Sequence, residues 1–160
     1  MMKRPLLLAA ALVAMPAAAS AQSKQAVVPK GTEWARDTLH FSPAVISGDM
    51  IYLSGVGIGL RPGETEADKA KAIERAFKMI GLILKESGAS WDDVVQITTY
   101  HTDLSPDASA EDQQAVFRAV KDKYVREPYP AWTAVGVTRL WDKDLFAEIS
   151  VVARVPAKPR

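Results

Sequence analysis

The stretch PAWTAVGVTRLWDKDLFAEISVVA (residues 130–153) decides the fold, because its side chains alternate in character along two runs. Alternation with a period of two is typical of β-strands, so we predict two strands joined by a short polar connection, as in a hairpin. One face of the first strand carries Trp132, Ala134, Gly136 and Thr138. One face of the second strand is uniformly apolar, and we expect it to lie against a core. It consists of Ala147, Ile149, Val151 and Ala153.

Glu148 lies on the opposite face of the second strand, among apolar residues. An unpaired buried carboxylate is costly, so this side chain must reach water, find a partner or shift its pKa. Two interpretations stay open. Glu148 is either a general acid/base that positions water, or a structural carboxylate that pairs with Arg139 or Arg118 at a subunit interface.

The composition of the chain indicates one globular domain and excludes several kinds of site. The chain has 160 residues, no cysteine, two histidines and a formal net charge of +1. Disulfides and thiolate chemistry are therefore excluded, and a protein-built metal site is disfavoured. Without Lys3 and Arg4, which lie in the segment described next, 18 basic residues face 19 acidic ones. A near-neutral domain without a basic run is a poor nucleic-acid binder, so we expect no nucleic-acid partner.

Residues 1–21 have the pattern of a secretory signal peptide. Lys3 and Arg4 precede an apolar stretch that is too short to span a bilayer comfortably, and Ala19-Ser20-Ala21 matches a peptidase site. An uncleaved anchor is the alternative, but the position of Pro16 and the small residues favours cleavage before Gln22. We therefore expect a periplasmic or secreted protein with no stable membrane association once the signal is removed.

The remaining chain divides into a flexible tail at 22–32 and one domain at 33–157. Gly48-Asp49 turns the chain into a strand over 50–54, and the glycine-rich segment 55–59 is expected to be an irregular loop whose backbone passes close to another group. It lacks the spacing of a phosphate-binding loop. Helices are predicted over 65–87 and from Ser109 to about Tyr124, with a strand over 94–102 between them. The inward residues of the second helix are expected to be Ala115, Val116, Ala119, Val120 and Tyr124.

This order of elements predicts an α+β domain with a mixed sheet and both helices packed on one face. The open face would then carry Trp132, Glu148 and Ser150. Large aromatic side chains on an open face favour burial against another subunit.

Several segments together resemble the RidA/YjgF family. They are MIYLSG (50–55), SGASWDDVVQITTY (87–100) with Asp103-Leu104 after it, Pro130-Ala131, and AEISVVA (147–153). The resemblance covers most of residues 40–155 and keeps the order of elements. It implies a chorismate-mutase-like fold and a homotrimer with ligand clefts between subunits. It also implies hydrolysis of enamines and imines, such as 2-aminoacrylate, to a carbonyl compound and ammonia without a cofactor.

The chain departs from the family where active members grip the substrate carboxylate. They carry an arginine directly after the Pro-Ala pair, and this chain has Trp132 there. An indole offers one N–H and no charge, whereas a guanidinium binds a carboxylate with two hydrogen bonds. The resemblance places Ala44 where the family has a tyrosine, and Gln114 where it has an asparagine.

Other positions agree with the family. Glu148 matches the glutamate that helps to position the attacking water, and Ser54 and Gly55 match the backbone that lines the pocket. The candidate site is therefore Glu148 as the catalytic residue. The candidate ligand-binding residues are Trp132, Ser54, Gly55, Ala134, Gln114 and Ala44.

Three functional hypotheses follow. The first is an exported trimer that binds a small, less acidic or more aromatic metabolite and hydrolyses an imine through Glu148. The second is a non-catalytic ligand-binding or chaperone-like trimer. Trp132 is either a stacking platform for a planar or aromatic ligand or an interface aromatic residue that fills the cleft. The third, a ribonuclease, is disfavoured by the charge. Tyr52, Tyr129 and His101 are expected to have packing or hydrogen-bonding roles, and His40 is a similar case near the cleft.

Overall fold

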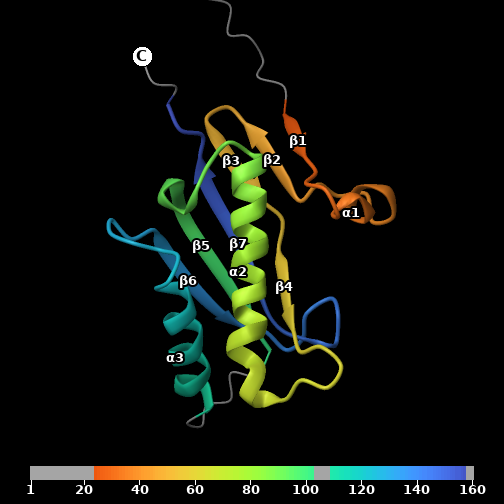
Figure 1. Cartoon of the computed structure of the whole chain (residues 1–160), viewed down its shortest axis with the longest axis vertical. Coiled ribbons are helices and arrows are strands. Elements are labelled where there is room, and N and C mark those ends of the chain that lie inside the picture. The colour runs from red at the N-terminus through yellow and green to blue at the C-terminus, as the bar shows by residue number, and fades with distance from the viewer. Residues whose placement is uncertain (1–23, 103–108, 158–160) are drawn as a thin grey trace, which may run out of the picture.

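The domain is built on one mixed β-sheet, shown in Figure 1. The computed structural model describes residues 24–102 and 109–157, so the proposed signal peptide lies outside the described residues. The strands run in the order β1-β2-β3-β7-β5-β6, and β4 also pairs with β7. Their bounds are β1 Gln25–Val27, β2 Ala44–Ser47, β3 Met50–Leu53, β4 Val56–Gly59, β5 Val94–His101, β6 Ala131–Gly136 and β7 Leu145–Arg154.

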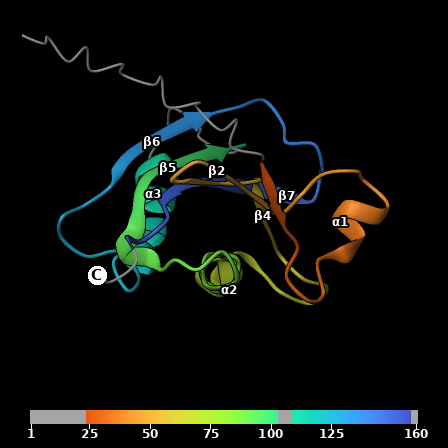
Figure 2. The same ribbon diagram turned by 90° about the horizontal axis from the view of Figure 1, so that it is seen from above.

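Two long helices cover one face of the sheet, as predicted, and Figure 2 shows them on the same side. α2 spans Lys69–Glu86 and α3 spans Ser109–Lys121, while α1 (Glu33–Asp37) is a short helix beside β4 and β7. The backbone N–H of Thr65 donates to the Asp68 carboxylate over 3.0 Å, as part of a capping box in the turn that precedes α2. α2 ends before Gly88, whose φ of +79° closes the helix at little cost. No helix within the described ranges is long and apolar enough to cross a membrane.

The core lies between α2 and the apolar face of β7. Ala147, Ile149, Val151 and Ala153 are all buried, so the prediction for this face is confirmed. They meet the helical stripe that contains Ile73, Phe77 and Ile80. Burial of one such side chain contributes about 1.5–3 kcal/mol, which makes this layer the main source of stability.

The predicted hairpin is wrong, because β5 lies between β6 and β7. β6 runs parallel to β5, and parallel neighbours need a crossover connection, which α3 provides. The face assignment of Trp132 is wrong for the same reason. Trp132 is in register with the buried Ile97 and lies on the helix-covered side, whereas Glu148 is in register with Tyr100 on the open side.

The inward face of α3 also differs from the prediction. Ala115, Val116 and Ala119 are exposed, Phe117 is buried in their place, and Val120 is buried as predicted. Phe117 presents the largest apolar side chain of the helix, so burying it removes more area from water than burying alanines does. Tyr124 does pack inward, with its ring centroid 5.2 Å from that of Phe77.

Two segments that were expected to be irregular form strands. Part of the predicted tail is β1, which pairs with β2, and the glycine-rich segment contains β4, which pairs with β7. The glycines do allow the backbone to pass close to another group, as expected, since a Cβ at Gly57 would lie 2.5 Å from Cδ1 of Leu145. A strand can therefore approach β7 closely only without side chains at these positions.

Candidate functional site

A cavity of about 920 Å³ opens where β3 bends into β4, between α1 and β7. Its size is typical of small-molecule sites. Ser54, Gly55 and Glu148 line it, and aromatic walls come from Trp34, Phe41 and Trp141. The cavity therefore joins three of the predicted site residues to a group of aromatic side chains.

Glu148 reaches this cavity because Gly55 leaves room for it. A Cβ at position 55 would lie 2.9 Å from Cγ of Glu148 and closer still to its carboxylate. Burial among apolar groups raises the pKa of the Glu148 carboxyl, since desolvation disfavours the charged form. Within the described ranges Glu148 forms no ion pair, with Arg139, Arg118 or any other cation. The predicted structural ion pair of Glu148 with Arg139 or Arg118 is therefore not formed within one subunit.

Hydrogen bonds hold the bend beside Glu148 in place. The Ser54 hydroxyl donates to the Ser42 carbonyl over 2.7 Å, and its backbone N–H donates to the Pro43 carbonyl over 3.0 Å. These bonds tie the segment after α1 to the backbone that faces the carboxylate. Ser54 thus has a positioning role that its place in the sequence alone does not reveal.

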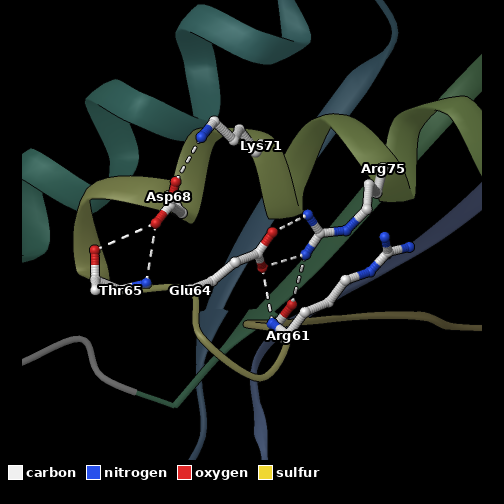
Figure 3. Close-up of polar contacts among 7 residues, drawn as sticks. Arg61, Glu64, Thr65, Asp68, Lys71 and Arg75 are labelled. Atoms are coloured by element: carbon white, nitrogen blue, oxygen red, sulfur yellow. Dashed lines mark hydrogen bonds and ion pairs between the residues drawn. The ribbon is translucent and has the colours of Figure 1, made fainter.

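The far end of β4 is held by an ion pair, shown in Figure 3. The Arg75 guanidinium donates to both carboxylate oxygens of Glu64, over 2.7 and 2.8 Å, and to the Gly59 carbonyl over 3.2 Å. The hydrogen bond from Arg75 lowers the pKa of Glu64, with a further contribution from the backbone N–H of Arg61. A bidentate pair of this geometry fixes orientation well, so β4 is anchored at both ends.

Trp132 lies away from this cavity, in a cluster between β5, β6 and α3. Its indole N–H donates to the Thr99 hydroxyl over 3.1 Å, and its ring stacks on Phe117 with centroids 5.9 Å apart. Nζ of Lys121 lies 5.4 Å from the ring centroid, a cation–π arrangement. A site that contains both Trp132 and Glu148 therefore needs two chains.

The remaining predicted ligand residues are also outside the cavity. Ala44 is fully buried in the core, and Gln114 is exposed on α3. Ala134 shares the face of Trp132 on β6, because both lie in register with buried residues of β5. These placements bring Ala134 near Trp132 but bring neither residue to Glu148.

A buried polar group beside Trp132 was only partly anticipated. Nε2 of His101 lies 2.9 Å from the Thr99 hydroxyl, which fits its expected hydrogen-bonding role. Burial lowers the pKa of His101, and the side chain of Gln113 opposes this shift. Gln113, rather than Gln114, is the buried glutamine of α3. Because α3 was placed on the wrong face, sequence reasoning missed it.

Sequence reasoning also missed the aromatic walls of the cavity. Trp34, Phe41 and Trp141 follow no strand or helix period, so the only available signal was their size in polar segments. His40 is exposed beside Phe41 with a φ of 56°, and does not line the cavity. No cluster of three or more potential metal ligands occurs in the part of the chain that the structure describes.

The fold and the site together define a class of protein. It is a small α+β domain with one helix-covered sheet and a carboxylate at a cavity beside the sheet, and that carboxylate has no ion-pair partner among the described residues. The family model described as endoribonuclease L-PSP matches residues 35–155. The chain therefore belongs to the RidA/YjgF family.

Individual relatives agree with this assignment. The RutC family protein YjgH of Escherichia coli is 35% identical over 133 residues, which are 83% of this chain and 96% of the relative. A solved structure of protein YJGH superimposes with a TM-score of 0.65 at 34% identity, covering 87% of this chain and all of that one. The putative reactive intermediate deaminase TdcF of Escherichia coli is 28% identical over 66% of this chain and 79% of its own length. These similarities support a RidA-like function in general terms.

Proposed function

We propose that this protein hydrolyses small enamines or imines to a carbonyl compound and ammonia, using Glu148 to activate water. One observation carries the proposal: a carboxylate with a raised pKa lies at a cavity of about 920 Å³ and has no partner within the described ranges. A raised pKa makes a carboxylate a better proton acceptor near neutral pH. The deaminase name of the relative TdcF supports the same reaction class.

The chemistry requires only a positioned water and a proton carrier. The water oxygen bonds to the iminium carbon while Glu148 takes one water proton, which leaves a neutral carbinolamine. Glu148 returns that proton to nitrogen, the C–N bond breaks with its electron pair on nitrogen, and the hydroxyl proton passes to the released ammonia. An iminium ion and water thus become a carbonyl compound and an ammonium ion. One carboxylate serves as base and then as acid.

Substrates that carry a carboxylate are expected to be poor, because Trp132 replaces the family's arginine and is held by Thr99 and Phe117. The test compares 2-aminoacrylate with the imine that a flavin amine oxidase releases from 2-phenylethylamine. Ammonia release should accelerate with the second substrate, and Glu148→Gln should abolish the acceleration. Glu86→Gln, an exposed change at the end of α2, is the matched control. Rapid wild-type turnover of 2-aminoacrylate would refute the loss of the carboxylate clamp, and would point to an arginine from another subunit.

A second candidate is a non-catalytic ligand-binding or chaperone-like trimer. The packing of Trp132 against Thr99 and Lys121 favours this second candidate. Active relatives bind substrate with an arginine at this position, and Trp132 is already engaged in contacts within its own chain. Ligand binding without turnover of either imine, unchanged by Glu148→Gln, would establish this candidate and refute the enzyme.

The proposed protein is an exported homotrimer. Residues 1–21 carry the signal-peptide pattern, and Trp132 and Glu148 can meet only across a subunit boundary. Light scattering after size-exclusion chromatography should give three copies. Mass spectrometry of exported protein should show a chain that starts at Gln22, and a retained residue 1 would contradict export by cleavage.

A further inference from the structure

We propose that the cavity beside Glu148 selects planar cations that carry an apolar or aromatic group, such as the protonated imines of hydrophobic amines, and that Trp34, Phe41 and Trp141 determine this selectivity. The inference rests on the proposed function only in naming imines as the class of substrate. The preference for a cation with a flat apolar substituent follows from the cavity itself.

The charged side chains of the cavity lining are more negative than positive. Glu148, Asp142 and Lys143 are the charged residues that line the cavity. Lys143 already pairs with Asp144, with Nζ 2.7 Å from the carboxylate. Glu148 therefore forms no ion pair with a cation among the described residues of the lining, and Asp142 adds a second carboxylate to that lining. A bound cation would supply the missing counter-charge, whereas an anion would meet two carboxylates.

Aromatic rings contribute flat apolar surfaces to the cavity lining. The rings of Trp34 and Phe41 meet edge to face, with centroids 6.1 Å apart and planes at 86°. Trp141 enters the cavity lining although its side chain is 95% exposed, so little of this protein's own structure packs against it. Aromatic faces attract both flat apolar groups and cations. The three rings therefore suit a ligand that combines a planar cation with an aromatic substituent.

The aromatic wall formed by Trp34 and Phe41 and the Glu148 carboxylate belong to one site. The backbone N–H of Phe41 donates to the Ala35 carbonyl over 3.0 Å, which folds the segment after α1 back on the helix. Ala35 is buried, so α1 is anchored in the domain. Ser54 then ties residues 42 and 43 to the bend beside Gly55. A change in the aromatic wall should thus alter ligand affinity while Glu148 stays in place.

The test uses stable probes and measures binding by calorimetry on the full protein at pH 7.5. Benzamidinium is a planar cation that mimics an aromatic iminium, benzoate is its anionic counterpart, and acetamidinium lacks the ring. Benzamidinium should bind at least tenfold more tightly than either of the others. Trp34→Ala and Trp141→Ala should each weaken benzamidinium binding by roughly tenfold while leaving acetamidinium binding nearly unchanged, as expected for the loss of a ring contact. Glu148→Gln should remove the preference over benzoate.

Tyr129→Ala is the matched control, because Tyr129 is an exposed aromatic residue outside the cavity. Equal affinity for benzamidinium and benzoate would overturn the inference. So would Trp34→Ala and Trp141→Ala variants that change the oligomeric state but not ligand affinity, since the rings would then be covered by a second copy. Imine turnover without benzamidinium binding would refute this inference and leave the proposed function standing. Selective benzamidinium binding without turnover of any imine would refute the proposed function and leave this inference standing.

Discussion

Gly55→Ala tests whether the position of the Glu148 carboxylate controls activity. The added Cβ would lie 2.9 Å from Cγ of Glu148, whereas ordinary contacts begin at 3.4 Å. Cγ must therefore move by about 0.5 Å, and Oε1, the carboxylate oxygen that lies closer still, by at least about 1 Å. A misplacement of that size lowers the rate of a positioned reaction by about 10²-fold.

The fold should tolerate this substitution. The atoms that the new methyl group meets are the end of a flexible side chain, so overpacking should cost about 1 kcal/mol, at the low end of the usual range. The assay measures ammonia release from the imine of 2-phenylethylamine, together with thermal unfolding of the same samples. We expect about a hundredfold loss of activity with a melting temperature a few degrees below that of the wild type.

Gly57→Ala is the comparison for stability. Its Cβ would lie 2.5 Å from Cδ1 of Leu145. This atom is also the end of a flexible side chain, and Leu145 lies on β7, as Glu148 does. Gly57→Ala should destabilise the protein by a similar amount and lower activity less than tenfold, because the three atoms nearest to that Cβ all belong to Leu145 and not to the carboxylate. Equal activity losses in the two variants, or full activity in Gly55→Ala, would refute the argument that Gly55 positions Glu148.

Three further predictions concern stability and pH. Glu148→Gln should raise the melting temperature at pH 7.5 but not at pH 4. The raised pKa of Glu148 means that its stabilising contribution is present below its unfolded pKa and is lost as pH rises. The same difference in melting temperature between variant and wild type at both pH values would contradict this. The lowered pKa of His101 has the opposite effect on stability, so the wild type should lose stability as pH falls below about 6.5. His101→Gln should flatten this part of the plot of melting temperature against pH. A loss of stability over the same pH range in the variant would show that another group causes it. Arg75→Met should lower the melting temperature more at pH 7 than under acidic conditions that protonate Glu64, because the lowered pKa of Glu64 means that the contribution of the pair is lost as pH falls. The variant should also speed amide exchange in β4, and unchanged exchange would show that the ion pair does not hold this strand.

The family, the α+β class and the packing layer were determined by the sequence itself. The alternation of Ala147, Ile149 and Val151 and the helical stripe around Phe77 are local periodicities, and each specifies a buried face without reference to the rest of the chain. The caution over Glu148 came from the same pattern, because a carboxylate interrupts an apolar strand. Its raised pKa and its place at a cavity agree with that caution.

Only the tertiary structure decided which elements are neighbours. Periodicity gives the two faces of a strand but not which one meets the helices, so the insertion of β5 between β6 and β7 reversed the side assigned to Trp132. The cavity depends on the same kind of information. Trp34 on the short helix α1, Phe41 shortly after it and Trp141 before β7 come from two separate parts of the chain, and they line the same cavity as Glu148 beside the bend at Ser54 and Gly55. Contacts between distant, aperiodic segments leave no repeat in the sequence, which is why this part of the site could be found only in the folded chain.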